Sequence, residues 1–401
     1  MKVDASNSFC FYPFYQIAIK SFNKEKVSAV APCCNMMGST NPFESYTNNQ
    51  KDSFQDYFYS EPMEKLRKQL IAGEKPECCN ICWNLENKGL KSHRFNSEHS
   101  IPDKHVVNVE SPKLVTVDIA TGNNCNLRCR MCSPLSSNKL NIDYNKMSPT
   151  DIVAVEWTNT RIRDTSPKEN TAWKNFLKDH GEVVNIKAVG GEPFITDEFI
   201  NLLKRYIETG KAKNTRLEIT TNGTKFSKKI MELLNEFKFI FLILSIDSVG
   251  KHYEYIRYPM PWKNLNISID TFFERIKTHF DVVVSTPIMI YNVFTMDKLC
   301  EWAKEKNINH VFCDNVKPVG RGIDIIHIPN NLLQMYYDKV KPYYDTGYFR
   351  GQGAYYLEFM TKNSVENKTK SKQELAVFDK IRNQNYENFL DKEIVRWLNE
   401  E

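Results

Sequence analysis

Residues 114–132 read LVTVDIATGNNCNLRCRMC, and this stretch decides the fold class of the chain. Its first part, residues 114–119, is rich in apolar and β-branched side chains and predicts a buried strand. Cys125, Cys129 and Cys132 follow in a C-x3-C-x2-C array. Three thiolates on one tight loop can each bind one iron of a cubane cluster, which leaves the fourth iron without a protein ligand. We therefore predict an open iron–sulfur site, with a zinc knuckle or chance core cysteines as the alternatives.

Strand-like and helix-like segments alternate after this loop. The strand-like runs are residues 114–119, 184–189, 216–220, 239–246, 282–290 and 310–313, and the helix-like segments are residues 197–209, 225–237, 267–278 and 296–306. Such alternation predicts an α/β fold with a parallel sheet and covering helices. Six units predict a partial (β/α)6 parallel barrel over residues 111–325. The cysteine loop then lies at the carboxyl end of the first strand, where parallel α/β folds build active sites.

Two further regions flank the predicted barrel. Residues 1–110 form a small Cys-rich module, with a possible hairpin of residues 14–19 and 27–31, a helix over 62–72 and a linker over 99–111. Residues 326–401 predict a helical C-terminal extension, with its clearest helices at 331–340 and 373–398.

The composition excludes several classes of protein. Apolar residues make up 41% of the chain and charged residues 26%, as in an ordinary globular protein. The longest apolar runs, residues 237–246 and 282–294, fall short of the roughly 18 residues that span a bilayer. The N-terminus does not read as a signal peptide, so we expect a cytoplasmic protein without membrane contact. The 54 basic and 49 acidic residues form no basic stripe interleaved with aromatics, which argues against nucleic-acid binding.

The cysteine array, the strand before it and the alternating pattern up to about residue 321 resemble the radical S-adenosylmethionine (SAM) superfamily. The resemblance implies a 4Fe-4S cluster whose open iron binds the amino and carboxylate groups of SAM. It also implies reductive cleavage of SAM to a 5′-deoxyadenosyl radical that abstracts hydrogen from a substrate. Met131 stands where the family usually carries an aromatic residue beside the adenine, and a flexible thioether can fill that apolar position.

A second motif of this family follows one strand later. Gly190, Gly191, Glu192 and Pro193 match the motif that binds the SAM ammonium group. Glycines allow close approach of the backbone to a ligand, and a carboxylate suits a cationic amine. A tight strand-to-helix turn without a ligand is the alternative.

Further family positions occur in order along the chain. Ser245 and Asp247 match residues that contact the ribose or carboxylate of SAM, and Arg257 matches a partner of the SAM carboxylate. A surface ion pair between Arg257 and Glu254 is the alternative. The turn of residues 220–223 and Asn292 also resemble family positions.

A separate group of cysteines precedes the barrel. Eleven cysteines, an odd number with nine in the first third, argue against a disulfide framework. One ligand from each hairpin end and a C-x2-C pair make four, enough for an auxiliary 4Fe-4S cluster or for zinc. The module resembles the twitch or SPASM modules of radical SAM enzymes, although those usually follow the barrel. The predicted ligands are Cys10, Cys33, Cys79 and Cys82, with Cys34 and Cys78 as alternatives to their neighbours.

No general acid or base can be assigned from the sequence. Cys313, at the end of the last strand-like run, is a candidate hydrogen-atom donor, with a small core residue as the alternative; Cys300 is expected to be inert. The resemblance favours hydrogen abstraction from an unactivated carbon of a peptide or protein, with flavodoxin or ferredoxin as electron donor. A dehydrogenase or rearrangement enzyme for a small polar metabolite is the first alternative. A non-enzymatic iron–sulfur or zinc protein that transfers electrons or scaffolds a partner is the second.

Overall fold

The computed structural model describes residues 8–20, 29–36, 54–87, 92–97, 108–155, 176, 178, 182–315 and 320–400. These residues build one nine-stranded sheet in the order β2-β1-β3-β4-β5-β6-β7-β8-β9. All neighbouring strands are parallel except the antiparallel pair β1 and β2. The strands are β1 (Gln16–Lys20), β2 (Ala29–Ala31), β3 (Thr116–Ala120), β4 (Asn185–Val189), β5 (Arg216–Thr221), β6 (Phe239–Ser245), β7 (His279–Ile288), β8 (Val311–Asn315) and β9 (Phe349–Arg350).

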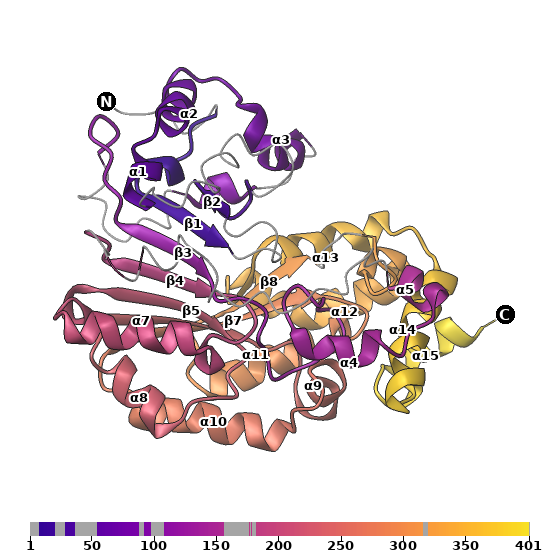
Figure 1. Ribbon diagram of the computed structural model, residues 1–401. Coiled ribbons are helices and arrows are strands. Elements are labelled where there is room, and N and C mark those ends of the chain that lie inside the picture. The colour runs from indigo at the N-terminus through magenta and orange to yellow at the C-terminus, as the bar shows by residue number, and fades with distance from the viewer. Residues whose placement is uncertain are drawn as a thin grey trace.

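Helices cover the sheet and its two ends. Figure 1 shows α7, α8 and α10 along one side of the sheet, α1 to α3 beside the β1–β2 edge, and α12 to α15 around the β8 end. Apolar spacing explains this cover: in α7, Phe199, Leu202, Leu203 and Tyr206 recur at helical intervals and are buried. The helices are α1 (Phe54–Phe58), α2 (Glu61–Ile71), α3 (Asn80–Asn87), α4 (Asn141–Tyr144), α5 (Pro149–Ala154), α7 (Asp197–Glu208), α8 (Lys228–Leu234), α9 (Gly250–Ile256), α10 (Trp262–Arg275), α11 (Met296–Glu305), α12 (Asn330–Asp345), α13 (Gln352–Asn363), α14 (Lys368–Arg382) and α15 (Lys392–Asn399).

The predicted α/β fold with a parallel, partial-barrel sheet is confirmed, and the six core strands are β3 to β8. Three helix predictions need correction. The helix expected over 331–340 runs on to Asp345 as α12. The single helix expected over 373–398 is two helices, α14 and α15, because Asn383 adopts a left-handed conformation with φ of 52° and ends α14. The helix expected over 267–278 begins earlier, at Trp262, directly after Pro261.

The N-terminal hairpin joins the same sheet as the barrel strands. Strand β1 pairs in parallel with β3, with Gln16 opposite Thr116, and β2 pairs with the far edge of β1. Because β2 runs antiparallel, Cys33 follows it at the edge of the sheet where β1 and β3 begin. The loop of Cys125 instead leaves β3 at the opposite edge. Residues 27–28 of the predicted hairpin and most of the predicted linker lie outside the described residues.

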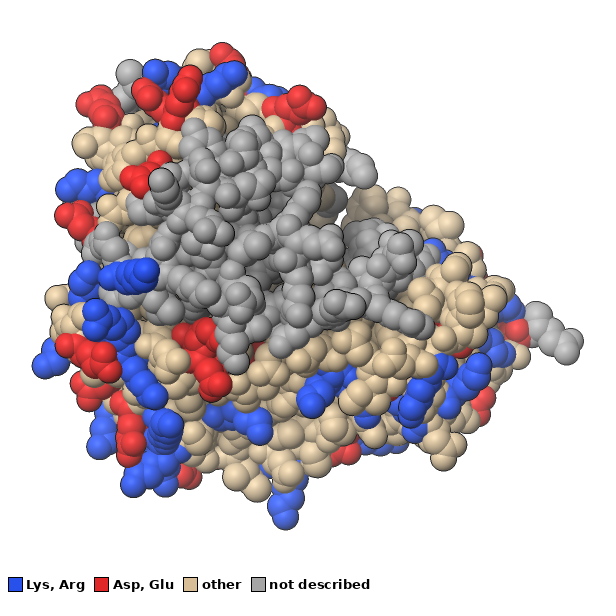
Figure 2. All heavy atoms as spheres, in the orientation of Figure 1, with Lys and Arg blue, Asp and Glu red and all other residues tan. Residues whose placement is uncertain are grey.

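The surface carries both signs of charge. Figure 2 shows Lys and Arg side chains interspersed with Asp and Glu on the visible face. Among the described residues, no helix combines the length and the apolar character that crossing a membrane requires.

Candidate active site

The three cysteines of the loop line one cavity at the carboxyl ends of the barrel strands. The cavity has a volume of about 310 Å³. Its lining combines the cysteine thiols with hydroxyl and amide groups, and Arg257 is the one Lys, Arg, Asp or Glu side chain among the described lining residues. The lining residues are Cys125, Leu127, Cys129, Met131, Cys132, Ser133, Ser136, Ser137, Gly190, Gly191, Thr220, Thr221, Asn222, Ser245, Arg257 and Pro287.

Backbone hydrogen bonds hold the cysteine loop against the segment that carries Arg257. The amide of Arg128 donates to the carbonyl of Tyr258 at 2.7 Å, and the amide of Arg130 donates to that of Ile256 at 3.0 Å. Arg257 therefore lies between two residues whose carbonyls are bonded to the loop. This pairing keeps the segment of Arg257 next to the cysteine loop.

Burial governs the chemistry of the loop thiols. Cys125 and Cys129 are each 7% exposed. Burial raises the pKa of Cys125 to about 11, and it raises the pKa values of Cys129 and Cys132 as well, although the positive charge of Arg257 opposes the shift at both. These thiols therefore stay protonated at neutral pH unless a metal displaces the proton.

The two glycines after β4 let this turn approach the chain just before Cys125. A Cβ atom on Gly190 would lie 2.7 Å from Thr121 Oγ1, and one on Gly191 would lie 2.2 Å from the carbonyl oxygen of Asn124. The φ of Gly190 is 137°, which also disfavours a side chain. Both glycines line the cavity, yet the atoms that they approach closely belong to residues 121–124 of the protein itself.

Glu192 is fully buried and binds the neighbouring turn after β5. Its carboxylate accepts hydrogen bonds from Thr221 Oγ1 at 2.7 Å, from the amide of Asn222 at 2.8 Å and from the amide of Phe194 at 3.2 Å. Burial raises the pKa of Glu192, against these hydrogen bonds. Glu192 and Pro193 are not among the cavity-lining residues, so the structure gives Glu192 a role in joining two turns.

Arg257 pairs with Asp247, and the alternative pairing with Glu254 is wrong. Arg257 Nε lies 2.6 Å from Asp247 Oδ2 and Nη2 lies 3.0 Å from Oδ1, a bidentate pair in which Asp247 is fully buried. Glu254 instead accepts a hydrogen bond from the amide of Trp262. The remaining nitrogen, Nη1, lies 4.0 Å from the sulfur of Cys129. Burial raises the pKa of Asp247, and Arg257 opposes this shift.

The other predicted residues divide into lining and supporting positions. Met131 and Ser245 line the cavity, as does Asn222 of the turn after β5. Asn222 Nδ2 lies 3.9 Å from Cys125 Sγ, and the sequence singled out only the turn that contains it. Asn292 is fully buried and donates to the carbonyl oxygens of Asp247 and Pro287, so it connects the ends of β6 and β7.

The donor set fits an iron–sulfur cluster and a polar cofactor. The three thiols share a cavity with no fourth cysteine among its described lining residues, and one cation and several hydroxyl groups surround them. Across the part of the chain that the structure describes, no three His, Cys, Asp or Glu side chains are grouped to hold a single metal ion. The assignment of Cys125, Cys129 and Cys132 as ligands is therefore a prediction that rests on their shared cavity and their chemistry.

The N-terminal cysteines line a second, smaller cavity of about 20 Å³. Cys33 belongs to this lining, whereas the sulfur of Cys34 lies 3.4 Å from His93 Nε2. The cysteines of the lining are Cys10, Cys33, Cys78, Cys79 and Cys82.

Cys313 and Cys300 lie outside both cavities. Each is fully buried, and neither is among the residues that line the loop cavity. A Cβ atom on Gly353 of α13 would lie 2.8 Å from the sulfur of Cys313, so α13 packs directly over this thiol. The position matches the core alternative for Cys313.

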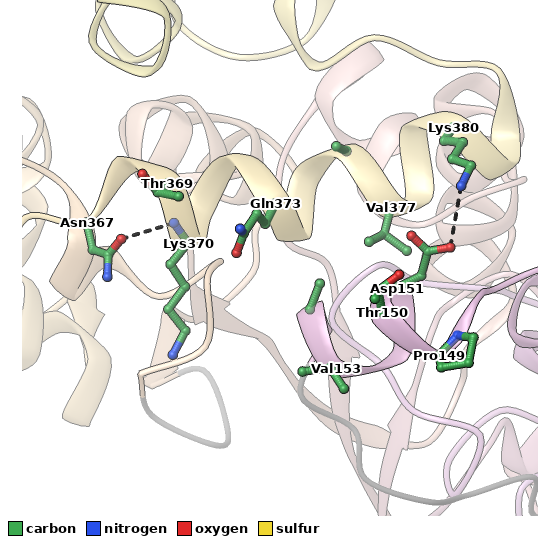
Figure 3. Close-up of a pocket in the computed structure, with 12 residues that line it drawn as sticks. Pro149, Thr150, Asp151, Val153, Asn367, Thr369, Lys370, Gln373, Val377 and Lys380 are labelled. Carbon is green, nitrogen blue, oxygen red and sulfur yellow. Dashed lines mark hydrogen bonds and ion pairs between the residues drawn. The ribbon is translucent and has the colours of Figure 1, made fainter. Parts of the chain in front are cut away.

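A larger groove of about 900 Å³ lies elsewhere, between α5 and α14. Figure 3 shows Asp151 of α5 and Lys380 of α14 reaching toward each other across it, at 3.6 Å. None of the predicted site residues lines this groove. Although this groove is larger, it is not the candidate active site, because no cysteine is among its described lining residues.

The part of the chain that matches a known family contains the cysteine loop and the turn of residues 190–193. Residues 119–305 match the family described as the radical SAM superfamily. The comparison with curated proteins gives no match.

Three solved structures show a distant likeness. One is anSMEcpe with bound AdoMet, at 16% identity over 59% of this chain and 63% of that one, with a TM-score of 0.40. Two are SuiB of Streptococcus suis, both at 18% identity: with S-adenosylmethionine (64% and 51% covered, TM-score 0.39) and with precursor peptide SuiA (67% and 54%, TM-score 0.38). This chain thus spans 51–63% of the length of these three proteins. The family match rests on the segment from β3 to α11, and residues 119–305 carry a domain that matches the radical SAM superfamily.

Proposed function

We propose that this chain is a radical SAM enzyme that binds a 4Fe-4S cluster through Cys125, Cys129 and Cys132. The observation that supports it is the shared cavity, in which two buried thiols and the partly buried thiol of Cys132 meet one arginine and a set of neutral polar groups. When bound, the cluster and SAM would supply a 5′-deoxyadenosyl radical that abstracts hydrogen from an unactivated carbon.

The chain's own residues would bind and orient the cofactor. Arg257 offers Nη1 to a carboxylate while Asp247 fixes the other two nitrogens, so the guanidinium is held in one orientation. Ser245 and Asn222 supply neutral polar groups at the cavity wall, and Met131 supplies an apolar surface for a base. Glu192 supports the site from behind by holding the turn of Asn222.

We propose a peptide or protein as substrate and a flavodoxin or ferredoxin as electron donor. The substrate proposal rests on the likeness of the N-terminal cysteine module to the auxiliary modules of peptide-modifying enzymes. A small polar metabolite is the second candidate, and the cavity volume of about 310 Å³, at the lower end for ligand pockets, favours a substrate presented at the mouth. Incubation with a deuterated candidate peptide separates the two, because label would then appear in 5′-deoxyadenosine.

The N-terminal site is proposed to hold an auxiliary 4Fe-4S cluster, with zinc as the alternative. The convergence of five cysteines on one cavity supports a metal there. Metal and sulfide analysis of anaerobically purified protein distinguishes the two: about eight irons per chain support two clusters, and about four irons with zinc support one.

The decisive test of the function is cleavage of SAM by the reduced, reconstituted protein. Cys125→Ala should abolish cleavage and remove about four irons per chain. Cys300→Ala, a buried cysteine outside both cavities, is the matched control and should retain both. Full cleavage activity in Cys125→Ala, or a loop metal enclosed by four side chains, would contradict the proposal.

A further inference from the structure

Helix α14 of the C-terminal extension contacts the cysteine loop through buried charged groups. Arg130, between two of the loop cysteines, is fully buried, and its Nη2 lies 2.6 Å from Asp379 Oδ1 of α14. Its Nε donates to the carbonyl of Tyr255 at 2.9 Å, and its guanidinium lies 3.6 Å from the centre of the Tyr255 ring. Arg130 is therefore fixed from two sides, by α14 and by α9.

A second contact reaches the next residue of the loop. Arg321 Nη1 donates to the carbonyl oxygen of Met131 at 3.0 Å, while its Nε and Nη2 bind Glu374 of α14. Arg321 and Glu374 are both fully buried. The segment of Arg321 is pressed against α14, since a Cβ atom on Gly322 would lie 2.5 Å from the carbonyl oxygen of Lys370.

A third contact comes from the end of the helix. Arg382 Nη2 donates to the carbonyl oxygen of Arg128 at 2.6 Å and to Asp143 of α4 at 2.7 Å. Asp143 in turn pairs with the side chain of Arg128 at 2.7 Å. The backbone of the loop is thus held at Arg128 by α14 directly.

We propose that α14 acts as a brace that positions the cysteine loop for its cluster, through Glu374, Asp379 and Arg382. The proposal deepens the proposed function, because it makes the C-terminal extension a positioning part of the same site. Charged pairs in a dry interior are directional, and loss of one partner leaves an uncompensated buried charge. Apolar packing alone would not fix loop carbonyls and guanidinium groups in this way.

Thiol reactivity in the metal-free, full-length protein tests the brace without a cluster. Alkylation with iodoacetamide, followed residue by residue by mass spectrometry, should become roughly tenfold faster or more at Cys129 and Cys132 in Glu374→Gln and in Asp379→Asn. Cys300 and Cys313, buried in the barrel core, report global unfolding and should react as slowly as in the wild type. Asp345→Asn, which removes a half-exposed pair with Lys341 in α12, is the matched control and should leave every rate unchanged.

Two outcomes overturn the brace. One is wild-type reactivity of Cys129 and Cys132 in both variants. The other is a parallel rise at Cys300 and Cys313, which would mean that the pairs support the whole fold and not the loop.

A second readout is spectroscopic. In the reduced, reconstituted protein, the change that SAM causes in the EPR spectrum of the cluster should be weakened in both brace variants and intact in Asp345→Asn. A wild-type change in both would overturn the proposal. If the proposed function itself fails, no variant gives the cluster spectrum, while the alkylation rates still decide whether α14 braces the loop.

Discussion

Gly191→Ala places a methyl group where the turn after β4 meets the chain that leads into the cysteine loop. The new Cβ would lie 2.2 Å from the carbonyl oxygen of Asn124 and 2.6 Å from its carbonyl carbon. Real Cβ contacts do not fall below 3.0 Å, and both atoms here are backbone, so one of the two segments must move. Asn124 is joined directly to Cys125, and the displacement therefore reaches the first predicted cluster ligand.

The expected cost follows from the size of that displacement. A misplacement of about 1 Å at a reacting centre reduces the rate by roughly 100-fold. We expect the rate of SAM cleavage by the reconstituted Gly191→Ala protein to fall by about that factor. The assay is anaerobic formation of 5′-deoxyadenosine, with urea unfolding in parallel to show that the chain still folds.

Gly210→Ala is the matched control for this substitution. Gly210 has a φ of 71° and no atom within 4 Å of a built Cβ, so alanine there is strained but meets no neighbour. It should cost about 1 kcal/mol of unfolding free energy and leave the cleavage rate unchanged. Wild-type cleavage by Gly191→Ala would refute the reasoning, because the clash would then have no consequence for the loop.

Three further predictions follow from other contacts. In Glu192→Gln, an NH2 group can take the place of the carboxylate oxygen that accepts a hydrogen bond from the Asn222 amide. Because that buried amide would then lack its acceptor, the free energy of unfolding in urea should fall by about 1–3 kcal/mol. Arg257→Lys keeps the charge but loses the bidentate contact to Asp247, and should weaken SAM binding, measured by equilibrium dialysis, by roughly tenfold or more; wild-type affinity would remove Arg257 from the site. Burial, with the nearby positive charge of Arg350, lowers the pKa of His310 from 6.5 to about 4. As the pH falls below about 6.5, His310 therefore takes up a proton in the unfolded chain before it does so in the folded chain. The free energy of unfolding is unaffected by His310 above about pH 6.5 and decreases as the pH falls toward 4. Urea unfolding at pH 7 and pH 5 should show a smaller loss in His310→Asn than in the wild type, and an equal loss would contradict the assignment.

The strands of the barrel could be predicted from the sequence because each strand is marked by a short run of neighbouring apolar residues. The run of residues 239–246 shows almost uninterrupted apolar character and forms β6, in which buried side chains alternate with partly buried ones. The cysteine spacing likewise predicted that Cys125, Cys129 and Cys132 would lie together, and they share one cavity.

The partners of the charged residues were beyond sequence reasoning. Arg257 lies three residues from Glu254 and ten from Asp247, and the only protein partner that the sequence offered for it, as an alternative to the SAM carboxylate, was the nearer Glu254. The chain leaves helical geometry at Arg257, where ψ is 47°, and this turns the guanidinium inward to Asp247. The contact of Arg130 with Asp379 spans 249 residues, and no local pattern signals such a pairing.

The pairing of β1 with β3 places the two groups of cysteines at opposite edges of one sheet. Cys33 follows β2 at the end of the ladder where β3 starts, and Cys125 follows the end where β3 stops. The five residues of β3 rise about 13 Å between these ends at roughly 3.3 Å per step. The ladder between these edges is hydrogen-bonded along β1 and β3, so a shift of one edge relative to the other would require its hydrogen bonds to break. Whatever binds at either group of cysteines is therefore held at the opposite edge of the sheet from the other group.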